Sequence, residues 1–243
     1  ENDGTFFIGS IVHNNFFLDG RADVDMDRGL WLTTRDYLVA LLRSEVDYLK
    51  SKYGAALDGI GGNGRDNGEN DEDYEEELEK ARDVLETTSK LETIIPSFLP
   101  NNPTLERFCL HHCDLESRNI MIQGTAISGI IDWESSSACP VWPYARCPTF
   151  IAGRGHDVEE TDAVNWDDPE EFEQVFHETQ LRRFFRSEIS KRDLAFGVAM
   201  HEGSKVQMFE DQVILTREYP RHVKRWINHL RSGSEGWDED LSA

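Results

Sequence analysis

Two short polar motifs flank a predicted β-hairpin, and this arrangement restricts the possible folds of the chain more than any other feature. Residues 119–123 and 126–131 are rich in Ile and have strong β propensity. The Gly124-Thr125 pair between them suits a two-residue type II′ turn. The chain therefore turns back on itself, and the residues just before the hairpin come close to those just after it.

The pairing of this hairpin predicts which side chains meet. If Gln123 pairs with Ala126, Asn119 faces Ile130 and Asp132 lies two residues further on. Diagonal neighbours of this kind are roughly 7–8 Å apart at the backbone. A carboxamide and a carboxylate at that separation can share one hard cation such as Mg²⁺, which prefers oxygen ligands.

A second carboxylate, Asp114, precedes Asn119 by five residues and is expected in the loop that enters the first strand. There it can orient a hydroxyl group and accept its proton, while metal ions neutralise the charge of transferred phosphates. Taken singly, Asp114, Asn119 and Asp132 would be ordinary turn and strand-end residues. Their combination predicts phosphoryl transfer.

The same residues resemble a known family. His112-Cys113-Asp114, the Asn five positions after the Asp, and the segment 131–134 (IDWE) are similar to the catalytic loop and metal-binding turn of the aminoglycoside phosphotransferases. That family shares its fold with choline kinases and protein kinases. The strong part of the resemblance covers residues 107–150, and a looser similarity runs through residues 6–53.

The resemblance implies roles for single residues. Asp114 would be the catalytic base, Asn119 and Asp132 would bind Mg²⁺, His112 would be structural, and ATP would be the phosphate donor. Cys113 departs from the small Gly that is usual in the family. The backbone angles of the loop are therefore an open question at this position.

The fold expected from these features is α+β and predominantly helical, a kinase-like C-terminal lobe in which a short β-hairpin carries the metal site. We expect one domain over residues 1–243, with an acidic flexible insert at about 59–72 and a frayed tail at 232–243. The periodicity predicts helices over about 34–53, 71–90, 169–189, 206–216 and 221–230. Thr33 and Asp36 form a near capping box for the first of these, and Pro96 and Pro100 are expected to end the helical region before the catalytic loop.

A kinase also needs a Gly-rich loop and a strand Lys that hold the ATP phosphates, both N-terminal to the catalytic Asp. Neither signal is found: Gly61, Gly62 and Gly64 follow a helix and precede an acidic run, and Lys50 and Lys52 end a helical pattern. We therefore expect the N-terminal nucleotide-binding lobe to be absent and the chain alone to be inactive. The alternative function is a non-catalytic, pseudokinase-like binding module or a truncated inactive relative.

The charge composition restricts the classes of molecule that the protein is expected to bind. With 25 basic and 47 acidic residues the net charge is −22, which disfavours nucleic acid. An acidic surface attracts cations, so the expected acceptor is a small, hydroxylated and cationic molecule, although the same acidity also serves solubility. Glu134, Asp157, Glu159, Glu160 and Asp162 are the acidic groups that could face such an amine by position. No apolar run is long enough for a membrane span, so we expect a cytoplasmic protein, whose oligomeric state and acceptor the sequence does not indicate.

Four cysteines, Cys109, Cys113, Cys139 and Cys147, allow two disulfides by number alone, but a chain with a sizeable core does not need them. Reduced thiols are expected. Because His111 and His112 lie between Cys109 and Cys113, zinc binding is an alternative, but these spacings are not the tight CxxC pairs of structural zinc sites.

Overall fold

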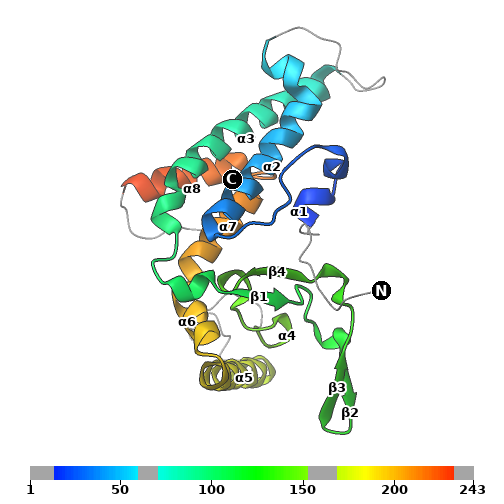
Figure 1. Ribbon diagram of the computed structural model, residues 1–243, viewed down its shortest axis with the longest axis vertical. Helices are drawn as coiled ribbons and strands as arrows, with labels where there is room; N and C mark the ends of the chain where they lie inside the picture. Colours follow the sequence, from blue (N-terminus) through cyan, green and yellow to red (C-terminus); the bar gives the residue numbers. More distant parts are fainter. Residues whose placement is uncertain (1–13, 60–70, 153–168, 233–243) are drawn as a thin grey trace, which may run out of the picture. The chain divides into compact units, whose positions relative to one another are not determined.

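The computed structural model describes residues 14–59, 71–152 and 169–232 (Figure 1). The chain divides into two compact units. One combines residues 1–99 with 205–243, and the other consists of residues 100–204. The single lobe predicted from the sequence remains a prediction. The two units are described separately below.

The first unit is built from helices. Its long elements are α2 (Thr34–Leu57), α3 (Asp71–Phe98), most of α7 (Ser204–Leu215) and α8 (Pro220–Ser232), preceded by the short α1 (Asn14–Phe17). Helix α2 begins where the sequence predicts, because the Thr33 hydroxyl accepts a hydrogen bond from the Asp36 backbone N–H at 3.1 Å. It extends four residues past the predicted end, to Leu57.

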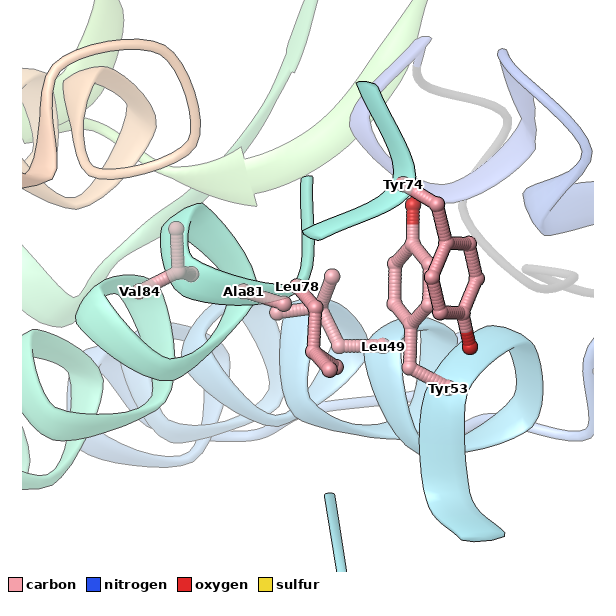
Figure 2. Close-up of a cluster of buried hydrophobic side chains, with 6 residues drawn as sticks. All are labelled: Leu49, Tyr53, Tyr74, Leu78, Ala81 and Val84. Atoms are coloured by element: carbon pink, nitrogen blue, oxygen red, sulfur yellow. The ribbon is translucent and has the colours of Figure 1, made fainter. Parts of the chain in front are cut away.

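Apolar side chains from α2 and α3 form a continuous core, shown in Figure 2. Tyr53 and Tyr74 meet edge to face with ring centroids 6.1 Å apart. The remaining members are Leu49, Leu78, Ala81 and Val84. These positions recur every three or four residues, so each helix buries one stripe and exposes the other.

Helix α3 is longer than the sequence predicts. Pro96 lies inside it, and the helix continues to Phe98. The prediction that Pro96 and Pro100 end the helical region is therefore wrong for Pro96, whereas the helix does end before Pro100. Packing explains the extension: Ile95 and Phe98 are buried, and the Phe98 ring lies 4.8 Å from Phe209 and 5.6 Å from Trp226. Burial of these side chains offsets the single backbone hydrogen bond that a proline removes near a helix end.

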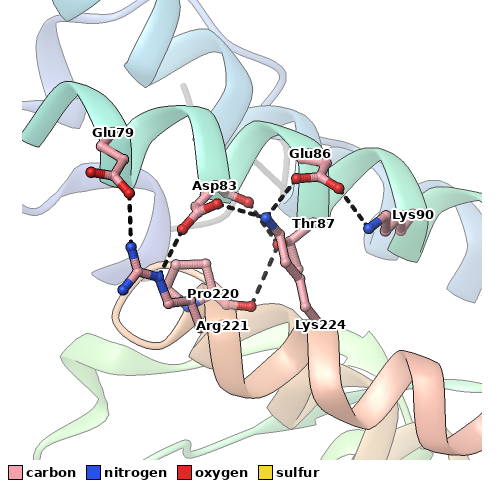
Figure 3. A network of polar contacts seen from close by, with 8 residues as sticks. All are labelled: Glu79, Asp83, Glu86, Thr87, Lys90, Pro220, Arg221 and Lys224. Carbon is pink, nitrogen blue, oxygen red and sulfur yellow. Dashed lines mark hydrogen bonds and ion pairs between the residues drawn. The ribbon is translucent and has the colours of Figure 1, made fainter.

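Helices α3 and α8 are also joined by a polar network, drawn in Figure 3. Lys224 contacts Asp83 and Glu86, each at 2.6 Å, and Arg221 contacts Asp83 at 3.1 Å. Arg221 also reaches Glu79 at 2.9 Å. The hydrogen bond from Lys224 holds the pKa of Asp83 below its usual value. Part of the acidic run of the sequence is thus neutralised within this helix pair.

The second unit contains two small antiparallel sheets and three helices among its described residues. Strand β1 (Phe108–His111) pairs with β4 (Ser137–Pro140), and β2 (Ile120–Gln123) pairs with β3 (Ala126–Ile130). The helices are α4 (Thr149–Ala152), α5 (Pro169–Arg192) and α6 (Leu194–Glu202). Single turns of 3₁₀ helix connect β1 to β2 (Ser117–Asn119) and β3 to β4 (Trp133–Ser135). Two more precede β1 (Pro103–Glu106) and follow β4 (Trp142–Tyr144).

The β2–β3 hairpin forms as predicted, but its register differs near the site. Gly124 has a φ of +64° at the first turn position, as a type II′ turn requires, and Gln123 pairs with Ala126. A bulge then shifts the ladder, so that Ile120, rather than Asn119, faces Ile130. The predicted partner of Asn119 is wrong by one residue, because Ser128 is accommodated without a partner.

The fold class is confirmed at the level of a predominantly helical α+β protein with small antiparallel sheets. The later helices occur close to their predicted positions, and α6 was not predicted. The core of the acidic insert, residues 60–70, and the tail from residue 233 lie outside the described residues. Among the helices that the structure describes, none combines the length and apolar character that crossing a membrane requires.

Candidate functional site

The predicted catalytic loop is closed by direct contacts between Asp114 and Asn119. The Asn119 amide nitrogen Nδ2 donates to the Asp114 backbone oxygen at 2.9 Å and to its carboxylate Oδ2 at 3.1 Å. Asn119 is 4% exposed, and its own backbone N–H donates to the Glu116 carbonyl at 3.0 Å. The five-residue spacing predicted from the sequence therefore forms a tight, locally hydrogen-bonded loop.

Two residues of the motif bind the backbone of Ile131, immediately before Asp132. The Asn119 carbonyl accepts the Ile131 N–H at 3.0 Å, and His112 Nε2 lies 2.8 Å from the Ile131 carbonyl oxygen. A carbonyl only accepts, so the His112 proton resides on Nε2. His112 thereby ties the loop to the chain segment that enters the Asp132 turn.

Asp132 occupies a sharp corner of the backbone. Its φ and ψ are +67° and +52°, in the left-handed region, and its side chain is exposed. The next residue fixes the corner from the other side: Trp133 Nε1 donates to the Ile130 carbonyl at 2.8 Å, and its ring lies 4.7 Å from that of His112. Asp132 is thereby held directly beyond the Ile131 peptide that Asn119 and His112 bind.

Cys113 also lies in the left-handed region, with a φ of +63°. This is the conformation that glycine adopts without cost and that a side chain disfavours. The backbone angles that the sequence left open at this position are therefore those that suit glycine better than a residue with a side chain. The Cys113 thiol contacts the Ser137 hydroxyl at 3.2 Å, which anchors the loop on strand β4.

Sequence reasoning did not single out Arg118. Its guanidinium lies 3.3 Å from Asp114 Oδ2 and 3.1 Å from a Glu116 carboxylate oxygen, while the side chain is 67% exposed. The four-residue spacing between Asp114 and Arg118 was the available signal, since side chains that far apart often meet when a segment is helical or tightly turned. Arg118 places one positive charge against the predicted base.

His111, just before the loop, is buried beside Tyr144, with ring centroids 4.8 Å apart. Burial lowers the pKa of His111 below its ordinary value, because the charged form is disfavoured away from water. Its Nε2 atom has no hydrogen-bond partner in the structure. His111 is therefore a neutral core residue of the β1–β4 ladder.

The donor set around the loop fits a hard cation only through oxygen atoms. The Asn119 nitrogen is used on Asp114, so its carbonyl oxygen is the end able to ligate a metal. Asp132 offers an exposed carboxylate. Among the described residues no three His, Cys, Asp or Glu side chains gather closely enough to hold a metal ion. A zinc site at Cys109 and Cys113 thus finds no support within these residues.

The predicted amine-binding acids are not brought together in the part of the chain that the structure describes. Glu134 lies in the turn after Asp132 and is exposed. Asp157, Glu159, Glu160 and Asp162 lie outside the described residues. A cavity of about 130 Å³ is lined only by side chains of the first unit, among them Arg21, Glu45 and Thr88, and includes no predicted site residue.

Comparison with known proteins gives one family. Residues 52–142 match the model of the phosphotransferase enzyme family (APH), which confirms the family resemblance found in the sequence. The match contains the loop from His112 to Asn119, the β2–β3 hairpin and the Asp132 turn. The looser similarity of residues 6–53 lies almost entirely outside it and remains a prediction. No curated protein and no solved structure gives a significant match to the chain.

Proposed function

We propose that the protein is a kinase-like phosphotransferase that transfers the γ-phosphate of ATP to a hydroxyl group of a small molecule. The observation that carries the proposal is the Asp114–Asn119 contact beside the Ile131–Asp132 turn, inside the segment that matches the phosphotransferase family. Phosphoryl transfer needs a positioned acceptor and charge neutralisation more than covalent catalysis by the protein. A short loop with one carboxylate and two oxygen ligands suits that requirement.

In this proposal Asp114 accepts the proton of the acceptor hydroxyl. Its carboxylate is one-third exposed, so a substrate oxygen has access to it. The hydrogen bond from Asn119 Nδ2 orients Oδ2, and the other carboxylate oxygen faces the acceptor. Asp114 then acts as a base that aligns the attacking oxygen.

Asn119 Oδ1 and the Asp132 carboxylate would hold Mg²⁺, which supplies positive charge to the phosphates when bound. The hydrogen bonds that Asn119 and His112 make to the Ile131 peptide keep these two ligands on adjacent segments. Asn119 therefore serves twice: its nitrogen orients the base and its oxygen binds the metal.

The acceptor proposed is a hydroxylated, cationic small molecule, since the net charge of −22 favours positively charged ligands. A cytoplasmic protein that binds neither nucleic acid nor membrane fits the same charge. The choice among antibiotics, choline, sugars and other alcohols depends on pocket shape. A screen of hydroxylated amines and sugars with the full-length protein and labelled ATP would identify the acceptor.

The first test is Asp114→Asn in the full-length protein. We expect phosphoryl transfer to fall by about 10²–10⁴-fold, the contribution of a positioned general base, with the unfolding midpoint nearly unchanged. Asp73→Asn, an exposed carboxylate in the first turn of α3, is the matched control. Full activity of Asp114→Asn would exclude Asp114 as the base.

The second test addresses the metal. Mg²⁺ titration in the presence of ATP should show weakened binding for Asp132→Ala and for Asn119→Ala, and unchanged binding for the control Glu134→Gln. Equal Mg²⁺ affinity in all variants would remove Asn119 and Asp132 from the metal site while leaving the role of Asp114 open to its own test.

One contact favours a second function, a non-catalytic binding module. Arg118 lies 3.3 Å from Asp114 Oδ2, so the predicted base is paired with a cation. Such a module would bind ATP or the acceptor without transfer, and Arg118→Ala would then change affinity only. A kinase predicts turnover that depends on Asp114, so a single-turnover assay separates the two functions.

A further inference from the structure

Three of the four cysteines surround one face of the β1–β4 ladder. Cys109 and Cys139 are direct partners in this antiparallel pair, and none of the four cysteines, all of which lie in the described part of the chain, forms a disulfide. Residues directly opposite each other project their side chains from the same face of a sheet. Their Cα atoms are about 4.5–5.5 Å apart, which falls within the roughly 4.4–6.8 Å that disulfides span.

The two thiols have different surroundings. Cys139 is buried, at 6% exposure, whereas Cys109 is partly exposed. The Arg107 guanidinium is anchored on Asp193 at 2.6 Å and also interacts with the Cys109 side chain. Cys109 is therefore accessible to a small oxidant and has a positively charged neighbour, whereas its cross-strand partner Cys139 is shielded from solvent.

A third thiol approaches the same face from the catalytic loop. Cys113 Sγ lies 3.2 Å from Ser137 Oγ, and Ser137 Oγ lies 3.9 Å from Cys139 Sγ. Ser137 thus lies between Cys113 and Cys139, whereas Cys109 and Cys139 face each other directly across the ladder. Cys147 differs from all three, since burial raises the pKa of its thiol and leaves it poorly reactive.

We propose that Cys109 and Cys139 form a redox-sensitive thiol pair that hydrogen peroxide converts into a disulfide. The Cys109 thiolate attacks one peroxide oxygen: an S–O bond forms, the O–O bond breaks, and the leaving hydroxide takes a proton to become water. The Cys139 thiolate then attacks the Cys109 sulfur of the sulfenic acid, the S–O bond breaks, and a second water leaves. Two thiols are oxidised by two electrons and the peroxide is reduced to two waters.

This proposal does not rest on the proposed function. It does concern the same loop, because β1 runs directly into His112 and Cys109 precedes Asp114 by five residues. The disulfide ties the strand that enters the loop to β4. Oxidation would therefore restrict the motion of the loop base without touching Asp114, Asn119 or Asp132.

The test treats the reduced, folded protein with stoichiometric hydrogen peroxide, counts free thiols and maps disulfides by mass spectrometry of non-reduced peptides. Two of the four thiols should disappear, one cross-linked peptide should join Cys109 to Cys139, and dithiothreitol should restore all thiols. Protein unfolded in urea before oxidation serves as the control for random pairing.

Variants decide which thiols react. Cys109→Ser should abolish the intramolecular cross-link, whereas Cys113→Ser and Cys147→Ala should leave it unchanged. A protein that retains all its thiols would overturn the proposal, as would a link between Cys113 and Cys139 or oxidation of Cys109 to sulfonic acid without a cross-link. The peptide map of the wild-type protein is decisive by itself, so the conclusion does not depend on whether every variant folds.

Discussion

The α2–α3 helix pair and the loop from His112 to Asp132 are stabilised by different kinds of interaction. In the helix pair, apolar stripes pack along two long helices, with Leu78 and Ala81 almost fully buried. In the loop, short segments are held by side chains that bind backbone atoms, such as Asn119 on Asp114 and His112 on Ile131. The first region draws its stability from burial, and the second from individual directed contacts.

The backbone shows the same difference. In the loop, Cys113 and Asp132 adopt positive φ angles although neither is glycine. Gly54, in contrast, lies within a regular helix, which does not require the conformational freedom of glycine. Such conformations are costly and persist only where surrounding contacts determine them. Backbone strain therefore lowers the local stability of the loop while its polar groups are held in place, and the helix pair has no such strain at Gly54. Substitutions in each region test this difference.

The largest effect is expected in the helix core. Leu78→Ala should lower the free energy of unfolding by about 2–5 kcal/mol, because it leaves a cavity where a side chain 4% exposed was packed. Urea denaturation measures this loss. Glu76→Ala, on the exposed face of the same helix, is the control and should change stability by less than about 0.5 kcal/mol. A loss under 1 kcal/mol at Leu78 would contradict the packing described.

The loop should respond to the loss of single hydrogen bonds. Asn119→Ala removes two contacts to Asp114, of 2.9 and 3.1 Å, from a buried position, and should cost about 1–3 kcal/mol. Arg118→Ala removes an exposed ion pair to the same residue and should cost about 0–1 kcal/mol. Equal effects of the two substitutions would mean that the amide contacts do not hold the loop.

A reciprocal pair of substitutions tests the backbone contrast directly. Cys113→Gly should stabilise the protein by about 1 kcal/mol by relieving a left-handed conformation. In α2 the opposite change should help: a Cβ at Gly54 meets no atom within 4 Å, so Gly54→Ala should add about 0.5–1 kcal/mol. Thermal unfolding of both variants is sufficient, and destabilisation by Cys113→Gly would show that its thiol contact with Ser137 outweighs the strain.

The smallest effects on stability are expected from changes in pH. The pH range in which stability is lost differs between the two regions. Burial lowers the pKa of His111, so between the lowered value and about 6.5 the unfolded chain binds the proton more readily. Stability is complete above about pH 6.5 and falls as the pH drops through the lowered pKa. Urea midpoints between pH 7.5 and pH 5 should show this slope in the wild type and a flatter one in His111→Phe.

In the helical unit the corresponding group is Asp83 of α3, whose pKa is lowered chiefly by the hydrogen bond from Lys224 of α8. Its contribution is complete above the ordinary pKa of about 3.9 and is lost as the pH falls through the lowered value. Lys224→Met should remove this acid-dependent part. A slope for Lys224→Met equal to that of the wild type below pH 4 would contradict the role of the network.

Periodicity was sufficient to predict the long helices but not their ends. Thr33 and Asp36 mark the start of α2 in the sequence and in the structure, because capping is a local interaction. The end of α3 is different: Pro96 is a local stop signal, and packing of Phe98 against Phe209 and Trp226, more than a hundred residues away in sequence, overrides it. Distant contacts of this kind leave no trace in local propensity.

At the candidate site, local sequence signals were sufficient to predict the loop from Asp114 to Asn119 and the hairpin that follows it. The five-residue spacing of Asp114 and Asn119 and the Gly124 turn are local, so they could be predicted. The bulge that sets the register, the contact of His112 with Ile131 and the pairing of Cys109 with Cys139 could be seen only in the folded structure. These contacts join segments whose alignment depends on side-chain packing in both strand pairs. No single stretch of sequence specifies that packing.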